Sequence, residues 1–259
     1  MQPKPGRVLL VGAGPGAADL LTLRAVRALQ QADVVLADAL VGDDIRALTP
    51  AAARIVEVGK RGHRPSTPQD FINRLMLRHA QAGEVVVRLK GGDPSIFGRA
   101  GEERAFLEAH GVQVEVIPGV TTASAAAAEF GFSLTTRADA RRVLLATGRT
   151  LEGPSGDIGI AADSLTTLCL YMGCTDIRRL CSQLLAAGRL ASTPAVAAIN
   201  VSRSNSRLVR STLSMLPDDL PDAMSDAPVF IAIGDACAAA VSTGEQRAVA
   251  PPAAARQAC

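Results

Sequence analysis

The chain of 259 residues has few aromatic side chains: it contains no tryptophan, one tyrosine and six phenylalanines. Proteins that bind single-stranded nucleic acids stack the bases on aromatic rings set among basic residues, and this composition offers no such platform. Lysine and arginine nearly balance aspartate and glutamate, which gives a net charge of +2. We therefore expect no nucleic-acid partner.

The sequence also lacks long apolar runs and paired cysteines. No stretch approaches the ~20 apolar residues that a membrane-spanning helix needs, so no membrane partner is expected. The five cysteines are odd in number and form no C-x-x-C pair, which argues against a disulfide framework and a zinc site. No signal peptide is visible before the first predicted strand. These features predict a cytoplasmic protein with reduced thiols and no bound metal.

The hydrophobic residues, 48% of the chain, alternate between strand-like and helix-like patterns. In the first half, strands are predicted at 7–11, 34–36, 54–58, 85–89 and 114–117. Helices are predicted from Thr22, from Thr67 with Pro68 at the first position, and over 102–110 and 121–129. This alternation is typical of an α/β fold with a mostly parallel sheet.

The character of the sequence changes between residues 134 and 142, where TTRADARR is polar and lacks helical periodicity. Beyond it the alternation returns, with strands predicted at 143–146, 168–171, 195–199, 207–211 and 229–233 and a helix at 177–187. We predict two α/β domains, an N-terminal one over 1–137 and a C-terminal one over 138–240. Residues 241–259, which are poor in large apolar side chains, are predicted to be a disordered tail.

The segment VRLKGGDPSIFGRAGEE, Val87–Glu103, indicates function more strongly than any other. Its apolar strand stops at Gly91-Gly92, and Pro94 prevents the strand from continuing. Adjacent glycines let a backbone approach a ligand where a Cβ would collide. In open α/β sheets, ligands bind beyond the carboxyl ends of the strands, and this turn would lie there.

A second glycine-rich turn, GAGPG at residues 12–16, follows the first predicted strand. It lacks the third glycine of the dinucleotide fingerprint at the position that packs the helix on the strand. The motif therefore does not favour an NAD site.

In their order and spacing, GAGPGAADLLTLRA, GKRG, LKGGDPSIFGR, IPGVTTA and YMG resemble the landmarks of the tetrapyrrole methylase family, over roughly residues 7–234. The resemblance implies transfer of two methyl groups from S-adenosylmethionine to uroporphyrinogen III, which gives precorrin-2 for the sirohaem, cobalamin and haem d1 branches. It also implies a homodimer, no metal, and an active site in the cleft between two α/β domains. The chain resembles the single-activity form, because no dehydrogenase-like extension precedes this region.

The resemblance further implies which residues form the site. It places the cofactor against Pro15, Gly91, Gly92, Asp93, Ile96, Thr121, Thr122 and Met172. It assigns acid–base roles to Asp38 and Lys60, and to Arg99 and Glu102 as a second pair near the substrate. The substrate carries eight carboxylates, so arginines are expected around it. The arginines at suitable loop positions are Arg61, Arg64, Arg99, Arg137, Arg141 and Arg149.

Simpler interpretations of these residues remain open when the pattern alone is considered. Arg99 and Glu102 have the spacing of a surface ion pair on a helix, and Lys60 could be a solvated loop charge. Met172 could be a core residue that follows a buried strand.

The chain departs from the family pattern on the substrate side. It has Thr136-Arg137-Ala138 where His-Arg-Asp is usual, Arg149 where a histidine is usual, 199–201 in place of a Glu-Asn-Gly stretch, and Ala37 in place of a tyrosine. Two alternatives therefore stay open. One is a methyltransferase for a later corrin-pathway intermediate, and the other is a non-catalytic paralogue that binds S-adenosylmethionine or a tetrapyrrole.

Overall fold

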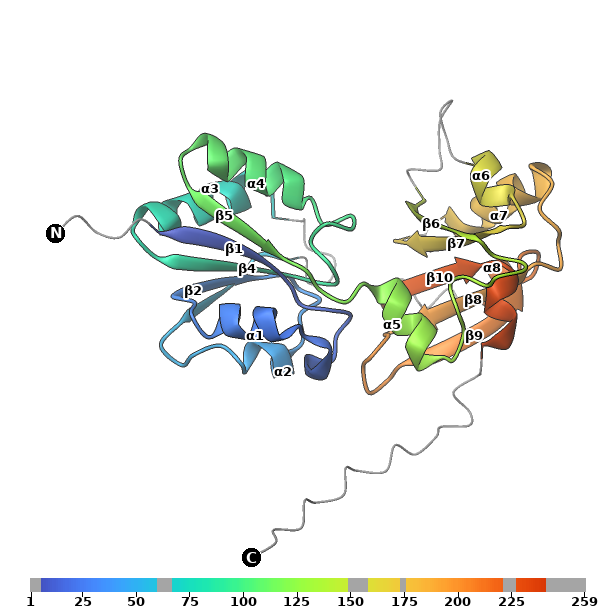
Figure 1. The fold of residues 1–259 in the computed structure, drawn as a ribbon, viewed down its shortest axis with the longest axis horizontal. Coiled ribbons are helices and arrows are strands. Elements are labelled where there is room, and N and C mark those ends of the chain that lie inside the picture. The colour runs from blue at the N-terminus through green and yellow to red at the C-terminus, as the bar shows by residue number, and fades with distance from the viewer. Residues whose placement is uncertain (1–5, 60–66, 149–157, 173–175, 221–226, 241–259) are drawn as a thin grey trace, which may run out of the picture.

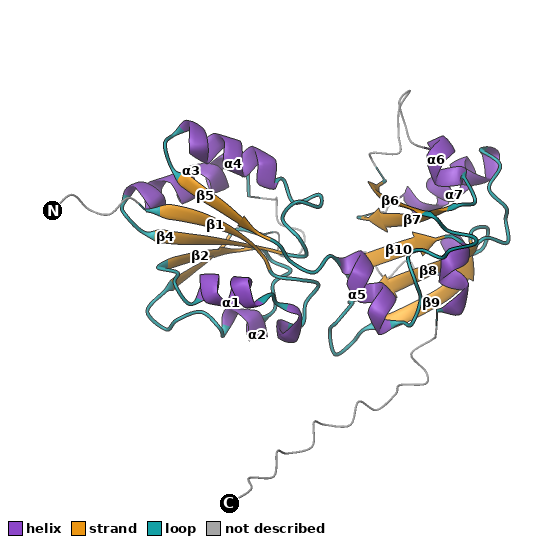
Figure 2. Ribbon diagram, viewed as in Figure 1, coloured by secondary structure: helices purple, strands orange, loops and turns teal. Residues whose placement is uncertain are grey.

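Two five-stranded β-sheets, one from each half of the chain, form the framework of the protein (Figure 1). The computed structural model describes residues 6–59, 67–148, 158–172, 176–220 and 227–240. Helices pack on both sheets (Figure 2), as expected for the predicted α/β class with two α/β units.

The first sheet is entirely parallel, in the order β3-β2-β4-β1-β5. Its strands are β1 (Arg7–Gly12), β2 (Val34–Ala37), β3 (Arg54–Glu57), β4 (Val85–Lys90) and β5 (Gln113–Ile117). All five predicted strands and their parallel arrangement are confirmed. Because the strands run the same way, their carboxyl ends meet at one edge of the sheet, where ligands of such sheets bind.

Helices cover both faces of this sheet, because its central strands are largely apolar on both sides. They are α1 (Leu23–Leu29), α2 (Asp43–Arg46), α3 (Gln69–Gln81) and α4 (Ala100–Ala109), with a 3-10 turn at Ala18–Leu20. Successive residues of a strand face opposite sides. Val86 therefore packs with α3 and α4 around Leu107, while Val87 packs with α1 and α2 around Leu29 and Ile45.

The predicted N-cap of α1 is confirmed, whereas that of α3 is wrong by one residue. Thr22 caps α1 as predicted, because its hydroxyl accepts the backbone N–H of Ala25 at 3.1 Å. The cap of α3 was predicted one residue too early, at Thr67. Pro68 holds an extended ψ of 137° and is itself the N-cap, so the helix begins at Gln69.

The helix α4 begins at Ala100, earlier than the predicted range of 102–110. Arg99 adopts a left-handed conformation, with a φ of 57°, immediately before the first helical residue. This sharp backbone turn brings the chain into the helix sooner than the side-chain pattern indicates. Arg99 is thus the N-cap residue and not a helical one.

The second sheet is mixed, in the order β6-β7-β10-β8-β9. Its strands are β6 (Arg142–Thr147), β7 (Thr166–Tyr171), β8 (Pro194–Ile199), β9 (Arg207–Thr212) and β10 (Val229–Ile233). Only β6 and β7 pair in parallel, and the other neighbours are antiparallel. Its helices are α6 (Ile158–Ala162), α7 (Ile177–Ala186) and α8 (Leu216–Asp219), with a 3-10 turn at Asp235–Ala239. The predicted strands and the helix α7 are confirmed, whereas the short elements were not predicted.

The helix α5 (Thr122–Glu129) follows the first sheet in sequence but packs on the second. Ala126 and Phe130 share a core with Val196 and Phe230, and Figure 1 shows α5 beside β10. The chain therefore crosses between the sheets before α5. The domain ranges 1–137 and 138–240 stay a prediction, and the tail 241–259 lies outside the described residues.

Arg189 is a buried cation that joins three segments of the second half. Its Nη1 donates to the carbonyl oxygens of Ala161 and Asp163, the latter at 3.2 Å. Its Nη2 donates to those of Thr166 and Ile233, at 2.9 and 3.3 Å. Burial lowers the pKa of Arg189, and the nearby acidic groups oppose this shift. The guanidinium thus bonds carbonyl groups at the end of α6, in β7 and in β10.

We expect Arg189→Met to lower the free energy of unfolding by about 3 kcal/mol, because buried carbonyl oxygens lose their donor. Urea denaturation followed by circular dichroism measures the loss. Arg104→Met is the control, since Arg104 only forms an exposed pair with Glu108 on α4. It should change stability by less than about 0.5 kcal/mol. Equal losses in both variants would contradict the role of Arg189.

Candidate functional site

A hollow of about 1450 Å³ lies where the strand ends of the first sheet face the second sheet. Asp38, Lys90 and Gly92 line it from the first half, and Tyr171 and Phe230 line it from the second. Sites for a single small molecule usually enclose roughly 300–1,000 Å³. This hollow therefore has room for two ligands at once.

The floor of the hollow is a junction of glycine turns. The backbone N–H of Gly92 donates to the carbonyl of Gly14 at 2.7 Å, and that of Gly14 donates to Gly92 at 3.2 Å. A Cβ on Gly119 would lie 2.3 Å from the carbonyl oxygen of Gly92, and one on Gly12 would lie 2.5 Å from the nitrogen of Gly119. The two glycine-rich turns singled out in the sequence are thus a single unit, joined to the turn after β5.

Asp93 holds this junction together. Its Oδ2 accepts the backbone N–H of Gly119 at 3.0 Å, and its Oδ1 accepts that of Ser95 at 2.7 Å. Each carboxylate oxygen has a second lone pair, so Asp93 retains capacity to accept from a ligand. The carboxylate predicted to meet the cofactor therefore also fixes the position of the turn after β5.

All eight residues expected against the cofactor line the hollow. They are Pro15, Gly91, Gly92, Asp93, Ile96, Thr121, Thr122 and Met172. Gly92 has a φ of +66°, and a Cβ built there meets no atom within 4 Å, so it would project into open space. Without a side chain at Gly92 the backbone of the turn borders open space directly, so a ligand could lie in contact with the backbone there.

The proposed acid–base residues lie in different surroundings. Asp38 and Arg99 line the hollow. Glu102 binds Arg99 through two hydrogen bonds, from Nε to Oε1 at 3.0 Å and from Nη2 to Oε2 at 2.6 Å. These bonds raise the pKa of Arg99 and lower the pKa of Glu102. Both side chains are exposed, so the pair stands at the mouth of the hollow.

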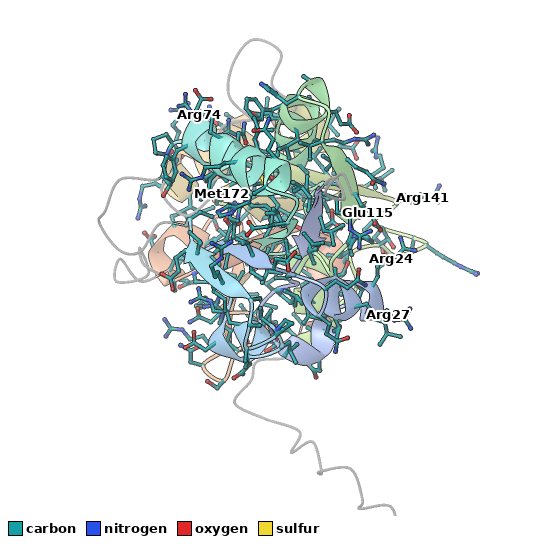
Figure 3. The ribbon with its side chains drawn as sticks, turned by 90° about the vertical axis from the view of Figure 1, so that its left-hand side faces the viewer. Arg24, Arg27, Arg74, Glu115, Arg141 and Met172 are labelled. Carbon is teal, nitrogen blue, oxygen red and sulfur yellow. The ribbon has the colours of Figure 1, made fainter. Side chains whose placement is uncertain are left out.

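The arginines expected around the substrate are only partly described. Lys60, Arg61, Arg64 and Arg149 lie outside the described residues. Arg137 and Arg141 are exposed and are not among the described residues that line the hollow. Figure 3 shows Arg141 at the right-hand edge of the molecule, well apart from Met172. The hollow has other cations on its second-half wall, namely Arg178, Arg179 and Arg203.

Sequence reasoning missed two buried cations, Arg88 and Lys90, which also line the hollow. The Nη2 of Arg88 lies 2.5 Å from Oδ1 of Asp38, and the Nζ of Lys90 lies 3.0 Å from both carboxylate oxygens of Glu103. Burial lowers the pKa of Lys90. The signal was present in the sequence, because two charges occupy alternate positions of an otherwise apolar strand.

Tyr171, the single tyrosine of the chain, was missed as well. Its hydroxyl lies 2.6 Å from Oγ1 of Thr121 and accepts the backbone N–H of Ala123 at 3.2 Å. Burial raises its pKa, so the phenol stays neutral. Its ring packs against Phe97 from the first half and Phe230 from the second. Tyr171 thus fixes Thr121 at the wall of the hollow.

The turn after β8, where the resemblance leads us to expect a Glu-Asn-Gly stretch, connects the two halves. The hydroxyl of Ser202 accepts the backbone N–H of Ala17 at 2.9 Å, and Nη2 of Arg203 donates to the carbonyl of Leu40 at 2.7 Å. Asn200 and Ser202 have positive φ angles of 52° and 62°. This turn is thus a place where the second half contacts the first.

The part of the chain that the structure describes contains neither a candidate metal site nor a membrane-spanning helix. No three His, Cys, Asp or Glu side chains gather there as a group that could hold a metal ion. No helix there is long and apolar enough to cross a membrane.

Comparisons with known proteins agree with this geometry. Residues 7–217 match the family Tetrapyrrole (Corrin/Porphyrin) Methylases. A uroporphyrinogen-III C-methyltransferase from Pseudomonas aeruginosa is 48% identical over 230 residues, which cover 89% of this chain and 94% of that protein. A sirohaem synthase from Pseudomonas putida is 44% identical over 89% of this chain, which spans 50% of that relative. The crystal structure of a uroporphyrin-III C-methyltransferase from Thermus thermophilus complexed with S-adenosylhomocysteine matches with a TM-score of 0.74 at 40% identity, over 89% of this chain and 98% of that one.

We expect Gly92→Ala to weaken binding of S-adenosylhomocysteine more than tenfold, because the new Cβ projects into the hollow. The strained positive φ should cost about 1 kcal/mol of stability. Isothermal titration calorimetry and thermal unfolding measure the two effects.

Gly111→Ala is the matched control. Gly111 also has a positive φ, of 76°, and open space around its Cβ, but it lies after α4 and does not line the hollow. It should lose similar stability and keep its affinity. Native affinity in folded Gly92→Ala would refute the placement of the cofactor.

Proposed function

The chain belongs to the tetrapyrrole methylase family, and we propose that it methylates uroporphyrinogen III with S-adenosylmethionine in the hollow between its two sheets. It is an S-adenosylmethionine-dependent methyltransferase, and uroporphyrinogen III is its substrate. The observation that carries the placement is that all eight residues expected at the cofactor line one hollow. That hollow is large enough to hold the methyl donor and a tetrapyrrole together.

The cofactor seat would have two walls. Gly91 and Gly92 would admit the body of the ligand on the first wall, and Thr121 and Met172 would contact it from the second. Met172 is 70% exposed and has a φ of 54°, a combination that a core residue would not keep. When bound, S-adenosylmethionine supplies a methyl group that its sulfonium makes electrophilic.

The protein's own part in the reaction is mainly to position the reactants. A pyrrole carbon forms a bond to the methyl group as the carbon–sulfur bond breaks, and a proton then leaves the ring system. Holding the carbon in line with the methyl group lowers the barrier, and a nearby base assists the proton transfer. We assign that base to Asp38, which Arg88 holds at the edge of the hollow. Lys60 stays a predicted partner in this step.

The carboxylates of the substrate would meet arginines on both walls. Arg99 stands at the mouth on the first wall, and Arg178, Arg179 and Arg203 line the second. A planar guanidinium can hold a carboxylate through two hydrogen bonds at once. The predicted contacts of Arg61, Arg64, Arg137 and Arg149 with the substrate stay predictions. We propose two successive methylations, with precorrin-2 as the product.

We also propose that the enzyme works in the cytoplasm as a homodimer. Cys169, Cys181 and Cys237 are buried free thiols. Burial raises the pKa of each of them, which suits a reducing compartment. The dimer rests on family membership alone. Sedimentation at micromolar concentration tests it, and a monomer would count against it.

The function itself is tested by anaerobic incubation with uroporphyrinogen III and S-adenosylmethionine, followed by mass spectrometry. We expect the product to gain two methyl groups. Methylation of precorrin-2 in place of uroporphyrinogen III would favour a later corrin-pathway enzyme. Binding of S-adenosylhomocysteine without transfer to either acceptor would favour a non-catalytic paralogue.

We expect Arg99→Lys to reduce the methylation rate at least tenfold with little change in cofactor affinity, because lysine keeps the charge but loses the planar fork. Steady-state rates against uroporphyrinogen III concentration, with calorimetry in parallel, measure both quantities. Arg104→Lys is the control, since Arg104 forms a similar exposed pair with Glu108 on α4, the helix that follows Arg99. Wild-type turnover in Arg99→Lys and Arg99→Ala alike would contradict a role at the substrate.

A further inference from the structure

Glu103, on the first turn of α4, is a fully buried carboxylate that faces two buried cations. Both of its oxygens lie 3.0 Å from the Nζ of Lys90, and Oε1 lies 3.4 Å from the Nε of Arg88. Gln69, the first residue of α3, donates its side-chain amide to Oε1 at 2.9 Å and to Oδ1 of Asn73 at 3.0 Å. One carboxylate therefore connects β4, α3 and α4.

Arg88 connects the buried cluster of Glu103, Lys90 and Arg88 itself to the hollow. Its Nε faces Glu103, while its Nη2 lies 2.5 Å from Oδ1 of Asp38. Its Nη1 donates to the carbonyl oxygens of Leu36 and Leu89, at 3.3 and 3.4 Å. The guanidinium is thus fixed on every side. The buried Glu103 lies at one end of it, and Asp38, which lines the hollow, lies at the other.

The cluster has two acidic and two basic side chains, so its charges balance: Asp38 and Glu103 face Arg88 and Lys90. Balanced charges of this kind seldom improve stability, because well-packed apolar residues in their place are often as stable or more so. A contribution to folding stability therefore does not explain well why the protein keeps four charged side chains together here. The contact between this cluster and Asp38, the proposed base, explains it better.

Two consecutive glutamates, Glu102 and Glu103, contact different arginines. Glu102 is exposed and binds Arg99 at the mouth of the hollow. Glu103 points into the protein and contacts Arg88 beneath it. Consecutive residues on a helix face different directions, so Glu102 binds a cation at the surface while Glu103 binds the cations of β4.

We propose that Glu103 is a positioning residue, which acts through Arg88 to set the orientation of the Asp38 carboxylate toward the substrate. This inference rests on the proposed function, in which Asp38 accepts the proton. The charge of Glu103 also pairs with Arg88 and Lys90 in the interior, so its loss would remove the contact at Nε and let the guanidinium, together with the Asp38 carboxylate that it binds, shift from its position.

A double-mutant cycle between Glu103 and Asp38 tests the proposal in the full-length enzyme. Glu103→Gln keeps the shape of the side chain and removes its charge. We expect it to lower kcat about 10- to 100-fold, as misplacing a reacting group does. The Kd for S-adenosylhomocysteine and the KM for uroporphyrinogen III should change less. In the Asp38→Asn background the same substitution should change kcat by less than about twofold, because the effect passes through Asp38.

A merely structural role gives a different result. Glu103→Gln would then lower kcat by the same factor in both backgrounds, or would leave it unchanged in folded protein, and either outcome overturns the proposal. Glu108→Gln on the same helix is the control, since Glu108 is exposed and pairs with Arg104. It should leave kcat, KM and Kd as in the wild type.

Two further variants keep the test decisive. If Glu103→Gln does not fold, Glu103→Gln combined with Lys90→Met removes one buried charge of each sign and enters the same cycle, with Lys90→Met alone as its reference. If Asp38→Asn is too slow to measure, Arg88→Lys replaces it as the second position. An unchanged kcat in Asp38→Asn would refute the proposed base and this inference with it, whereas methylation of uroporphyrinogen III by the wild type would still stand.

Discussion

Close backbone contact between glycines is the constraint on which the site depends. Gly12, Gly14, Gly92 and Gly119 lie at the ends of β1, β4 and β5, and a Cβ on Gly12 or Gly119 would collide with neighbouring backbone. Their contact joins three separate turns into one floor, which Asp93 fastens through the N–H of Gly119. Because this floor is backbone, a ligand can lie directly on it. The side chains that act on the ligand stand around it.

Backbone strain gathers around the same hollow. The non-glycine residues with positive φ in the described part of the chain are Phe97, Arg99, Met172, Asn200 and Ser202. Phe97, Arg99 and Met172 line the hollow, and the other two flank Val201, which also lines it. Such conformations cost about 1 kcal/mol or more each and persist where the surroundings enforce them. Three of these residues, from both halves of the chain, thus place their side chains in the lining of one hollow.

Local patterns made much of this arrangement predictable. Apolar strand patterns that alternate with helical patterns predicted the parallel sheet, and the two glycine turns indicated where a ligand would bind. Packing decided what the sequence left open. The alanine-rich helix α5 could cover either sheet, and only the core formed by Phe130 and Phe230 assigns it to the second. Arg88 and Lys90 mark one face of β4, but their partner Glu103 depends on where α4 lies. No local pattern specifies that position.

A crystal structure of the protein grown with S-adenosylhomocysteine tests most directly whether the glycine floor is the cofactor seat. The ligand should lie in the hollow, with Gly91 and Gly92 on one side of it and Thr121 and Met172 on the other. Its sulfur should face the space beside Asp38, where the acceptor carbon would stand. A ligand bound elsewhere, or one that contacts only one sheet and leaves Gly92 uncovered, would contradict this placement.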